Sequence, residues 1–420
     1  MPGDGDIREL LLALKDQAVS QMRQVAEEAV ERMEAKMEDQ LDEGGWNDAF
    51  SQFLDDLTTF PSAFLKGPVV RRKPSLKWVP SQQPQVIPAN GRAPSAFELQ
   101  VTDEMVLEWD RVDPFNIYPA PHASTIDDGN LIERHRLSRG DLEALKGVDG
   151  YSDAAIAAVL DEYGRGGLHE WVFTDIAKAE AEGKSTIAIS QNSGELIDAL
   201  QFWGSVQGKL LIEWGLDEKS VPDPLKEYSI EAWLIGTWVI RAVVNPDPLG
   251  RKPYYKASYE EVPGAFWGNS VADLVRDTQR ICNAAARGLV NNMGIASGPQ
   301  VWANVDRMPA GESVSQMYPW KIWQTTSDPM GSTAPPIGFF QPDSHVAELM
   351  GVYEKFSQLA DEYSGIPRYM TGDSPAGGAG RTASGMSMLM GNAGKSIKQV
   401  IANIGSKAIR HAIERLYFYN

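Results

Sequence analysis

The fold of this chain is decided by residues 264–293, which read GAFWGNSVADLVRDTQRICNAAARGLVNNM. Ser270 followed by Asp273 resembles a capping box, with Asp in place of the usual Glu or Gln. The apolar residues after it recur at helical spacing, with arginines between them. The stretch therefore predicts a helix from Ser270 to about Met293, roughly 36 Å long at 1.5 Å per residue.

A second helix is predicted from about Ser344 to Tyr363, in the stretch SHVAELMGVYEKFSQLADEY. Asp343 or Ser344 would cap its start, because both side chains accept hydrogen bonds from free backbone N–H groups. Its apolar residues follow steps of three and four and form one stripe. Ser364–Gly365 and then Pro367 would end it.

The insert between the two helices is rich in proline and tryptophan. Short strands are expected in it at Val301–Val305 and Tyr318–Trp323, and the prolines make the remainder irregular. A glycine-rich loop follows the second helix, and a longer helical pattern then runs to the end of the sequence. Gly391 and Gly394 each weaken that helix by roughly 1 kcal/mol relative to Ala, so we expect a kink near them.

The N-terminal part predicts a mixed α+β body. A helix is expected from Asp6 to Asp42, ending at Gly44–Gly45. Runs of β-branched and aromatic residues predict strands at residues 97–109, 210–214, 228–235 and 237–244. Prolines at positions 61, 68, 74 and 80 are expected to break the intervening chain into short extended pieces.

Composition narrows the function classes. A formal charge of −18 argues against a typical nucleic-acid-binding protein, which would be basic. Two explanations of the negative charge remain open. The acidic residues could line a channel that repels passing DNA, or they could simply keep the protein soluble. The lone Cys282 excludes an internal disulfide and fits a reducing cytoplasm. We find no signal peptide pattern and no apolar run of about 20 residues that would cross a membrane.

In their order and spacing, several short motifs make the chain resemble the portal proteins of tailed bacteriophages. The motifs are Phe60–Pro61, Lys66–Pro68, Asp113–Pro119, Gly268–Ser270, Gln279, Asn283, Asp343, Ser364–Pro367, Gly372–Pro375 and Arg381–Met386. Each is weak alone, and together they extend over most of the chain.

The resemblance implies a portal fold with an α/β wing, a helical stem, a small β or irregular clip and a tunnel loop followed by a long kinked helix. In this sequence the parts would be the wing at 1–265, stem helices at 266–296 and 343–364, the clip at 297–342, the tunnel loop at 365–383 and the long wing helix at 384–420. The helical crown of portal proteins is expected to be absent or truncated.

The resemblance also implies a function. The subunit would form a ring, usually of twelve copies, at one capsid vertex. Double-stranded DNA would be packaged through it by the terminase large subunit, retained and later ejected. The major capsid and scaffolding proteins and the tail adaptors would be its other partners, in the virion and, during assembly, in the host cytoplasm. No cofactor, metal, membrane or enzymatic activity is expected.

Three sets of residues are candidates for these roles. Residues 365–420 carry seven Lys or Arg against two Asp or Glu, and the candidate DNA contacts in the channel are Arg368, Arg381, Lys395 and Lys398. These could equally pair with acidic residues of a neighbouring subunit. The candidate clip contacts to terminase or adaptors are Trp302, Trp320 and Trp323, which could equally fill the clip's own core or a subunit contact. The stem candidates are Arg276, Gln279, Arg280 and Asn283.

Two other function classes compete with a portal. One is a capsid or baseplate structural protein without a DNA channel. The other is a nucleotide-dependent enzyme, since Gly394–Lys395–Ser396 resembles the end of a phosphate-binding loop. That loop needs a glycine where Leu389 stands, and no strand precedes it. The five histidines have no metal-ligand spacing.

Overall fold

The computed structural model describes residues 4–80, 97–164, 167–168, 172–183, 196–216, 219, 221–311, 315–316, 318, 320–328, 330–331, 333–366, 394 and 397–420. The chain divides into two compact units. The body unit comprises Met1–Ser270 with Lys398–Asn420, and the hairpin unit comprises Val271–Ile397. The body unit mixes helices with two β-sheets, in agreement with the predicted α+β class.

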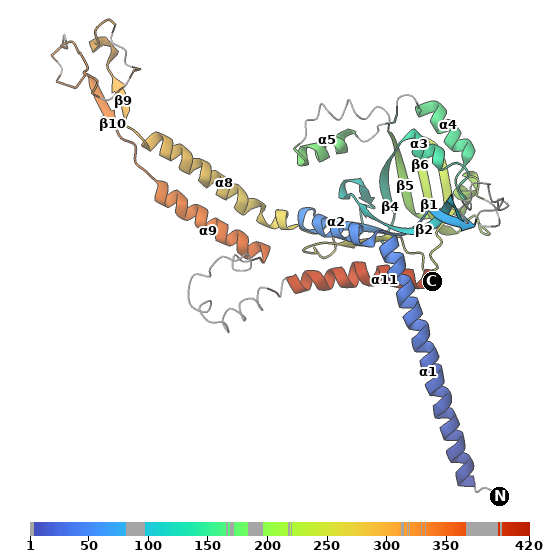
Figure 1. The fold of residues 1–420 in the computed structure, drawn as a ribbon. Helices are drawn as coiled ribbons and strands as arrows, with labels where there is room; N and C mark the ends of the chain where they lie inside the picture. The colour runs from blue at the N-terminus through green and yellow to red at the C-terminus, as the bar shows by residue number, and fades with distance from the viewer. Residues whose placement is uncertain are drawn as a thin grey trace, which may run out of the picture. The chain divides into compact units, whose positions relative to one another are not determined.

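The body unit begins with two helices, α1 and α2, which are drawn in blue in Figure 1. Its helices are α1 Asp4–Glu43, α2 Trp46–Thr59, η1 Pro114–Asn116, α3 Arg139–Ala144, α4 Asp153–Tyr163, α5 Val172–Ala181, α7 Gly208–Glu213, η5 Gly405–Ile409 and α11 Arg410–Tyr419. Its strands are β1 Ala63–Pro80, β2 Phe97–Val112, β3 Ile117–Pro119, β4 Leu131–Leu137, β5 Ile197–Gln207, β6 Glu227–Ile235, β7 Trp238–Val244 and β8 Tyr254–Ala257.

The hairpin unit has simpler contents. Its helices are α8 Val271–Ala296, η2 Val305–Arg307 and α9 Val346–Ser364, and its strands are β9 Gln300–Ala303 and β10 Ile337–Phe340. The two long helices lie where the sequence predicted them. The predicted strand at Val301–Val305 corresponds to β9, whereas its partner β10 was not predicted.

The turn after α1 also lies where the sequence predicted it. The helix ends at Glu43, directly before the glycine pair. A Cβ on Gly44 would lie 2.4 Å from the carbonyl oxygen of Leu107, and Gly45 has φ 74°, in the left-handed region. Glycine is therefore required twice at this turn, once for space and once for backbone conformation.

The two sheets of the body unit are antiparallel. The smaller has the order β2-β1-β8, and the larger is a meander in the order β3-β4-β5-β6-β7. One face of the larger sheet receives α3 and α4, through a cluster that includes Leu142, Ile156 and Ile197. The opposite face receives α7, whose Leu211 packs with Val221 and residues of β6. Helices thus cover parts of both faces of this sheet.

The first strand runs without a break through the prolines that we expected to interrupt it. β1 is 18 residues long and pairs with β2 from Phe64 to Pro80, with one register shift after Lys66. The second neighbour, β8, pairs only with Ala63–Lys66. A proline is tolerated in an edge strand because half of the N–H groups point away from the partner. The predicted short pieces are therefore wrong.

Two further predictions are corrected in the larger sheet. Residues 210–214 were expected to form a strand, but α7 is a short helix there, held by hydrogen bonds from the N–H groups of Gly208 and Lys209 to the segment before β6. The weak β propensity of this apolar run is overridden by tertiary contacts. Strands β3, β4 and β5 were not predicted. In β4, Glu133 and Arg134 occupy buried positions, which hides the usual alternation.

The terminal helical segment belongs to the core of the body unit. Residues 397–404 are α-helical, Gly405–Ile409 form a π-helical turn, and α11 continues to Tyr419. Ala408 and Ala412 are buried in a cluster with Phe53 of α2, Leu65 of β1 and Trp109 of β2. The kink predicted near Gly391–Gly394 falls almost wholly outside the described residues.

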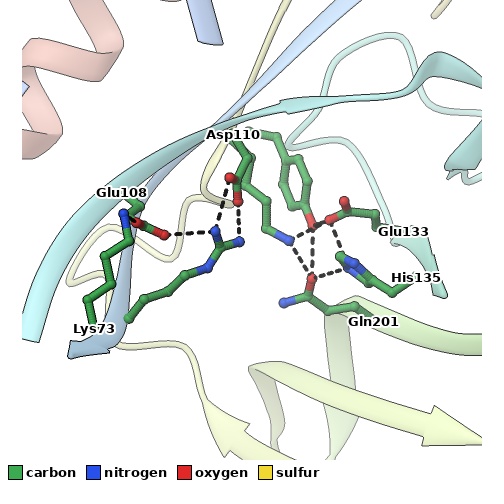
Figure 2. Close-up of polar contacts among 9 residues, drawn as sticks. Lys73, Glu108, Asp110, Glu133, His135 and Gln201 are labelled. Carbon is green, nitrogen blue, oxygen red and sulfur yellow. Dashed lines mark hydrogen bonds and ion pairs between the residues drawn. The ribbon is translucent and has the colours of Figure 1, made fainter. Parts of the chain in front are cut away.

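A buried polar network connects the two sheets (Figure 2). The ammonium group of Lys66 in β1 donates to Glu133 Oε2 of β4 at 2.5 Å and to Gln201 Oε1 of β5 at 2.6 Å. The hydroxyl of Tyr254 in β8 donates to the same Glu133 oxygen, and the ring of His135 lies 3.2 Å from it. Lys66 and Glu133 are only 4% and 6% exposed.

This network has large apolar clusters on both sides of it. Leu131, Trp203 and Tyr254 belong to one cluster, and Ile197 and Ala199 belong to another on the same sheet. Burial alone would raise the pKa of Glu133, but the Lys66 ammonium and the His135 ring hold that pKa well below its usual range. The carboxylate is therefore charged in the folded protein and depends on Lys66 to remain so.

We expect Lys66→Met to lower the free energy of unfolding by about 3–5 kcal/mol, because it leaves the Glu133 carboxylate buried without its counter-charge. Urea unfolding of the full chain, followed by circular dichroism, measures this loss. The matched control is Lys77→Met. Lys77 lies on the same strand and pairs with Glu104 at 3.0 Å, but both side chains are about half exposed, so a much smaller loss is expected.

Acid titration gives a second readout of the same pair. The pKa of Glu133 is lower in the folded than in the unfolded chain. Its stabilising contribution is therefore fully present above the unfolded value of about 4.3 and is lost as the pH falls below it. This loss should be smaller in Lys66→Met. Equal unfolding free energies for the two lysine variants, or identical acid profiles with and without Lys66, would contradict the assignment.

Candidate channel and interface residues

The hairpin unit is built on two antiparallel helices, α8 and α9, which run side by side (Figure 1). Three contacts set their register. Asn292 lies against the start of α9, Gly288 lies opposite Leu349, and the Cys282 thiol donates to the carbonyl of Tyr353 at 3.8 Å. The face of α8 that meets α9 presents small side chains, with Thr278, Cys282 and Ala285 buried. Small residues at this spacing allow the two helices to approach closely.

The start of α9 differs from the prediction. Neither Asp343 nor Ser344 caps the helix, since His345 occupies the N-cap position and makes no side-chain cap hydrogen bond. Asn292 of α8 provides the partner instead. Its Oδ1 accepts from the His345 N–H at 2.9 Å, and its Nδ2 donates to the Asp343 carbonyl at 3.2 Å. A side chain from the neighbouring helix therefore replaces the local cap. The C-terminal end agrees with the prediction, because Gly365 is left-handed with φ 69°.

The four stem candidates lie on one exposed stripe of α8, away from its contact with α9. Arg276 pairs with Asp273, and the Arg280 guanidinium lies 3.6 Å from Asp277. Gln279 donates to Asn283 at 3.2 Å. Each positive charge on this stripe is thus accompanied by a carboxylate one turn before it. Such a surface is polar without holding a strong net charge.

Large apolar side chains are exposed on the same two helices. They are Ile281, Val290, Met293, Ile295, Met350, Val352, Tyr353 and Tyr363. No residue of α9 is classed as buried in the single subunit, although its apolar residues form the stripe predicted from the sequence. Two helices alone therefore leave much of their apolar surface uncovered, which is typical of elements that pack against further copies or partners.

The clip candidates have different environments. Trp302 of β9 is paired with Gly338 of β10, and a Cβ on Gly338 would lie 2.3 Å from the indole ring. The ring of Trp302 therefore covers a glycine across the two-stranded sheet, an arrangement that stabilises a small sheet. Trp323 is half-buried, with the ammonium of Lys321 stacked on its ring at 3.7 Å from the centroid.

Trp320 is the most exposed of the clip candidates. It is 96% exposed and has φ 67°, the one non-glycine residue with a positive φ in the described part of the chain. A left-handed residue cannot continue an extended strand. The strand predicted at Tyr318–Trp323 is therefore wrong. Ile322 and Met330 are also strongly exposed, so the insert between α8 and α9 presents several apolar side chains to solvent.

The basic candidates are only partly within the described residues. Lys398 is exposed at the start of the terminal helical segment. Arg368, Arg381 and Lys395 lie outside the described residues, as does most of the predicted tunnel loop. Where side chains are described, no group of three or more His, Cys, Asp or Glu residues could hold a metal ion, and no helix is long and apolar enough to cross a membrane.

Sequence reasoning missed the residues that hold the hairpin unit together. Asn292 is one of two adjacent asparagines in an apolar stretch, and nothing in the sequence distinguishes it as the partner of α9. Contacts within the body unit were missed as well. From the sequence, Lys66, Gly268 and Asp113 are recognised only as members of the family motifs. Asp113 accepts from the N–H of Phe115 and pairs with Lys178 of α5. Spacing alone does not reveal contacts between residues so distant in sequence.

One comparison with known proteins bears on these features. Residues 229–420 match a family model described as the phage SU10 portal protein. The matched segment begins within β6 and includes α8, β9, β10, α9 and the terminal helical segment. A portal protein is a component of the virion, and this family generally implies an oligomeric ring that associates with the capsid. Over these residues the chain is similar to the phage SU10 portal protein family, and this match supports the resemblance to the portal proteins of tailed phages.

Proposed function

We propose that this subunit forms a ring-shaped channel at one capsid vertex. Double-stranded DNA would be packaged through the ring by terminase, retained and ejected, and the tail would attach to it. The family match supports the portal role. The proposal of a ring is supported mainly by the exposed apolar surface of α8 and α9. The subunits would meet through a repeated head-to-tail contact that closes on itself, in about twelve copies by family resemblance.

The stem helices suit a channel wall better than a DNA-gripping surface. The helix α8 carries three arginines and two aspartates, and α9 carries one lysine against four acidic residues. Arg276 and Arg280 are both matched by neighbouring carboxylates. A wall with little net positive charge makes few phosphate contacts, so a duplex would slide past it with little resistance. In this proposal the force comes from the terminase.

The basic candidates would supply weak contact along the channel. Repeated around a ring, single residues such as Lys398 form belts of positive charge that meet phosphates without reading sequence. The clip would supply the protein contacts. Its exposed tryptophans are large apolar anchors of the kind enriched at protein interfaces, and Trp320 has the greatest exposure among them.

Negative-stain electron microscopy of the purified full chain should show rings with a central hole about as wide as a DNA duplex, because the apolar stem surface requires neighbouring copies. A double substitution that places charge on this surface, Val290→Glu with Met293→Glu, should shift the population from rings to monomers. The control is Arg280→Gln, on the polar stripe of the same helix. Monomers under all assembly conditions would overturn the proposal, and solid or filamentous assemblies would favour a capsid or baseplate role.

Arg381→Ala combined with Lys395→Ala should reduce DNA packaging or retention in assembled particles, because it removes two charges per subunit from the proposed belts. Protected DNA per particle after nuclease treatment measures this effect. Lys209→Ala combined with Lys146→Ala, at two exposed positions of the body unit, is the charge-matched control. Unchanged packaging and retention would remove the contact role and favour pairing with acidic residues of a neighbouring subunit.

Trp320→Ala should weaken binding of terminase or a tail adaptor by roughly tenfold or more, as removal of a central aromatic anchor does at interfaces. Ring formation and thermal stability should stay unchanged, because the side chain is almost fully exposed. Surface plasmon resonance on assembled rings measures the affinity. Trp302→Ala is the contrasting variant, since it removes the ring that covers Gly338 and should destabilise the clip itself. Equal partner affinity for wild type and Trp320→Ala would exclude the anchor.

A further inference from the structure

The body unit contains a cavity of about 340 Å³ whose lining is strongly basic. This volume lies at the lower end of the roughly 300–1,000 Å³ usual for small-molecule sites. The basic residues of the lining are Arg251, Lys252, Lys256, Lys407 and Arg415, with His411 beside them, and the acidic residue is Asp127. The lining comes from the loop at 124–127, from β8 and the segment before it, and from the terminal helical segment.

The two lysines beside β8 donate to backbone carbonyls. Lys252 is 7% exposed, and its ammonium donates to the Ile126 carbonyl at 2.8 Å. Lys256 donates to the carbonyls of Phe266 and Ser124. Burial lowers the pKa of both ammonium groups. A negative charge in the cavity would offset this cost.

The arginines leave donors unused at the same place. Arg251 has two buried nitrogens, Nε and Nη2, without a hydrogen-bond partner. These two nitrogens form one edge of the guanidinium group, the edge that binds an oxyanion through two parallel hydrogen bonds. The nearest carboxylate oxygen, on Asp247, lies 3.7 Å from Nε, which is too far for a hydrogen bond.

Arg415 provides a third unused donor. It is 3% exposed, and its Nη1 and Nη2 atoms are engaged by Asp247 and by the carbonyls of Arg251 and Lys252. Its Nε atom is buried and has no hydrogen-bond partner at normal geometry, although the Tyr255 hydroxyl lies beside the guanidinium group. A buried donor without a partner costs about 1–3 kcal/mol. Three such atoms in the lining of one basic cavity indicate a ligand with several acceptor oxygens.

We propose that this cavity binds a phosphate group, held by Arg251, Arg415 and the adjacent lysines. A phosphate offers acceptor oxygens in several directions, whereas a carboxylate offers two oxygens in one plane. The cavity has donors from β8, from the segment before it and from the terminal helical segment, which suits the phosphate. The source is either a free phosphate compound or a nucleic-acid backbone. The lining belongs entirely to the body unit and shares no residue with the channel candidates.

Occupancy would bind the terminal helical segment to the sheet. Lys407 and Arg415 belong to that segment, whereas Arg251 and Lys252 directly precede β8. One bound phosphate that accepts from both groups acts as a bridge between them. The bridge adds to the existing contact between Arg415 and Asp247, at 2.6 Å. The ligand would therefore stabilise the body unit as well as bind to it.

Isothermal titration of the full chain with inorganic phosphate, at constant ionic strength set with chloride, tests the site. We expect saturable binding and a melting temperature that rises with phosphate concentration. Lys252→Met and Lys407→Gln should each weaken binding by roughly tenfold or more, the usual effect of losing one charge-assisted hydrogen bond. Lys209→Gln, an exposed lysine of the same unit that does not line the cavity, should bind as wild type does.

A second arm uses a short fluorescent DNA duplex to identify the source of the phosphate. Phosphate binding without duplex binding assigns the site to a free phosphate compound. Duplex binding that both phosphate and Lys407→Gln weaken assigns it to nucleic acid. Lys407 pairs with Glu261 at 2.5 Å, and its ammonium group has further donors for a phosphate. Its side chain is about half exposed, so its replacement should leave the fold intact even if Lys252→Met does not. No saturable phosphate binding by the folded wild-type chain, or equal binding by wild type and Lys407→Gln, would overturn the proposal.

Discussion

The body unit depends on one buried ion pair, between Lys66 and Glu133. Both groups lie between the two sheets, where desolvation opposes charge, and each is stable there because the other is present. Gln201 and Tyr254 complete the hydrogen bonds of the pair. Strands β1, β4, β5 and β8 each contribute one of these four residues. Because hydrogen bonds require specific distances and directions, the network fixes the relative position of the two sheets more tightly than an apolar contact would.

This network gives a physical meaning to the motifs through which the chain resembles portal proteins. In Lys66–Gly67–Pro68 the lysine is the centre of the network, and a Cβ on Gly67 would lie 2.4 Å from the Trp109 ring. Similarly, a Cβ on Gly268 would lie 2.4 Å from the Glu260 carbonyl oxygen. These residues are needed for packing and hydrogen bonding inside the body unit. A motif that carries family resemblance can thus mark the fold without marking a functional surface.

The sequence predicted α1, α8 and α9 well, because helical periodicity and glycine stops are local signals. It predicted β6 and β7 from β-branched and aromatic runs. It failed where distant residues decide the structure. β4 was hidden by Glu133 and Arg134, whose burial requires partners from other strands. The start of α9 depends on Asn292 of α8, and the site candidates were grouped by charge and size without knowledge of their surroundings.

The two units differ in how much of their apolar surface is buried. In the body unit, helices and sheets cover one another, and even charged groups such as Arg415 are enclosed. In the described part of the hairpin unit, two long helices and a two-stranded sheet are too few to enclose a core, so Met293, Tyr353 and Trp320 are exposed. A two-stranded sheet is marginally stable alone. The described residues of the body unit therefore cover most of their apolar surface within one subunit, whereas those of the hairpin unit leave much of it exposed, as the proposed ring would require.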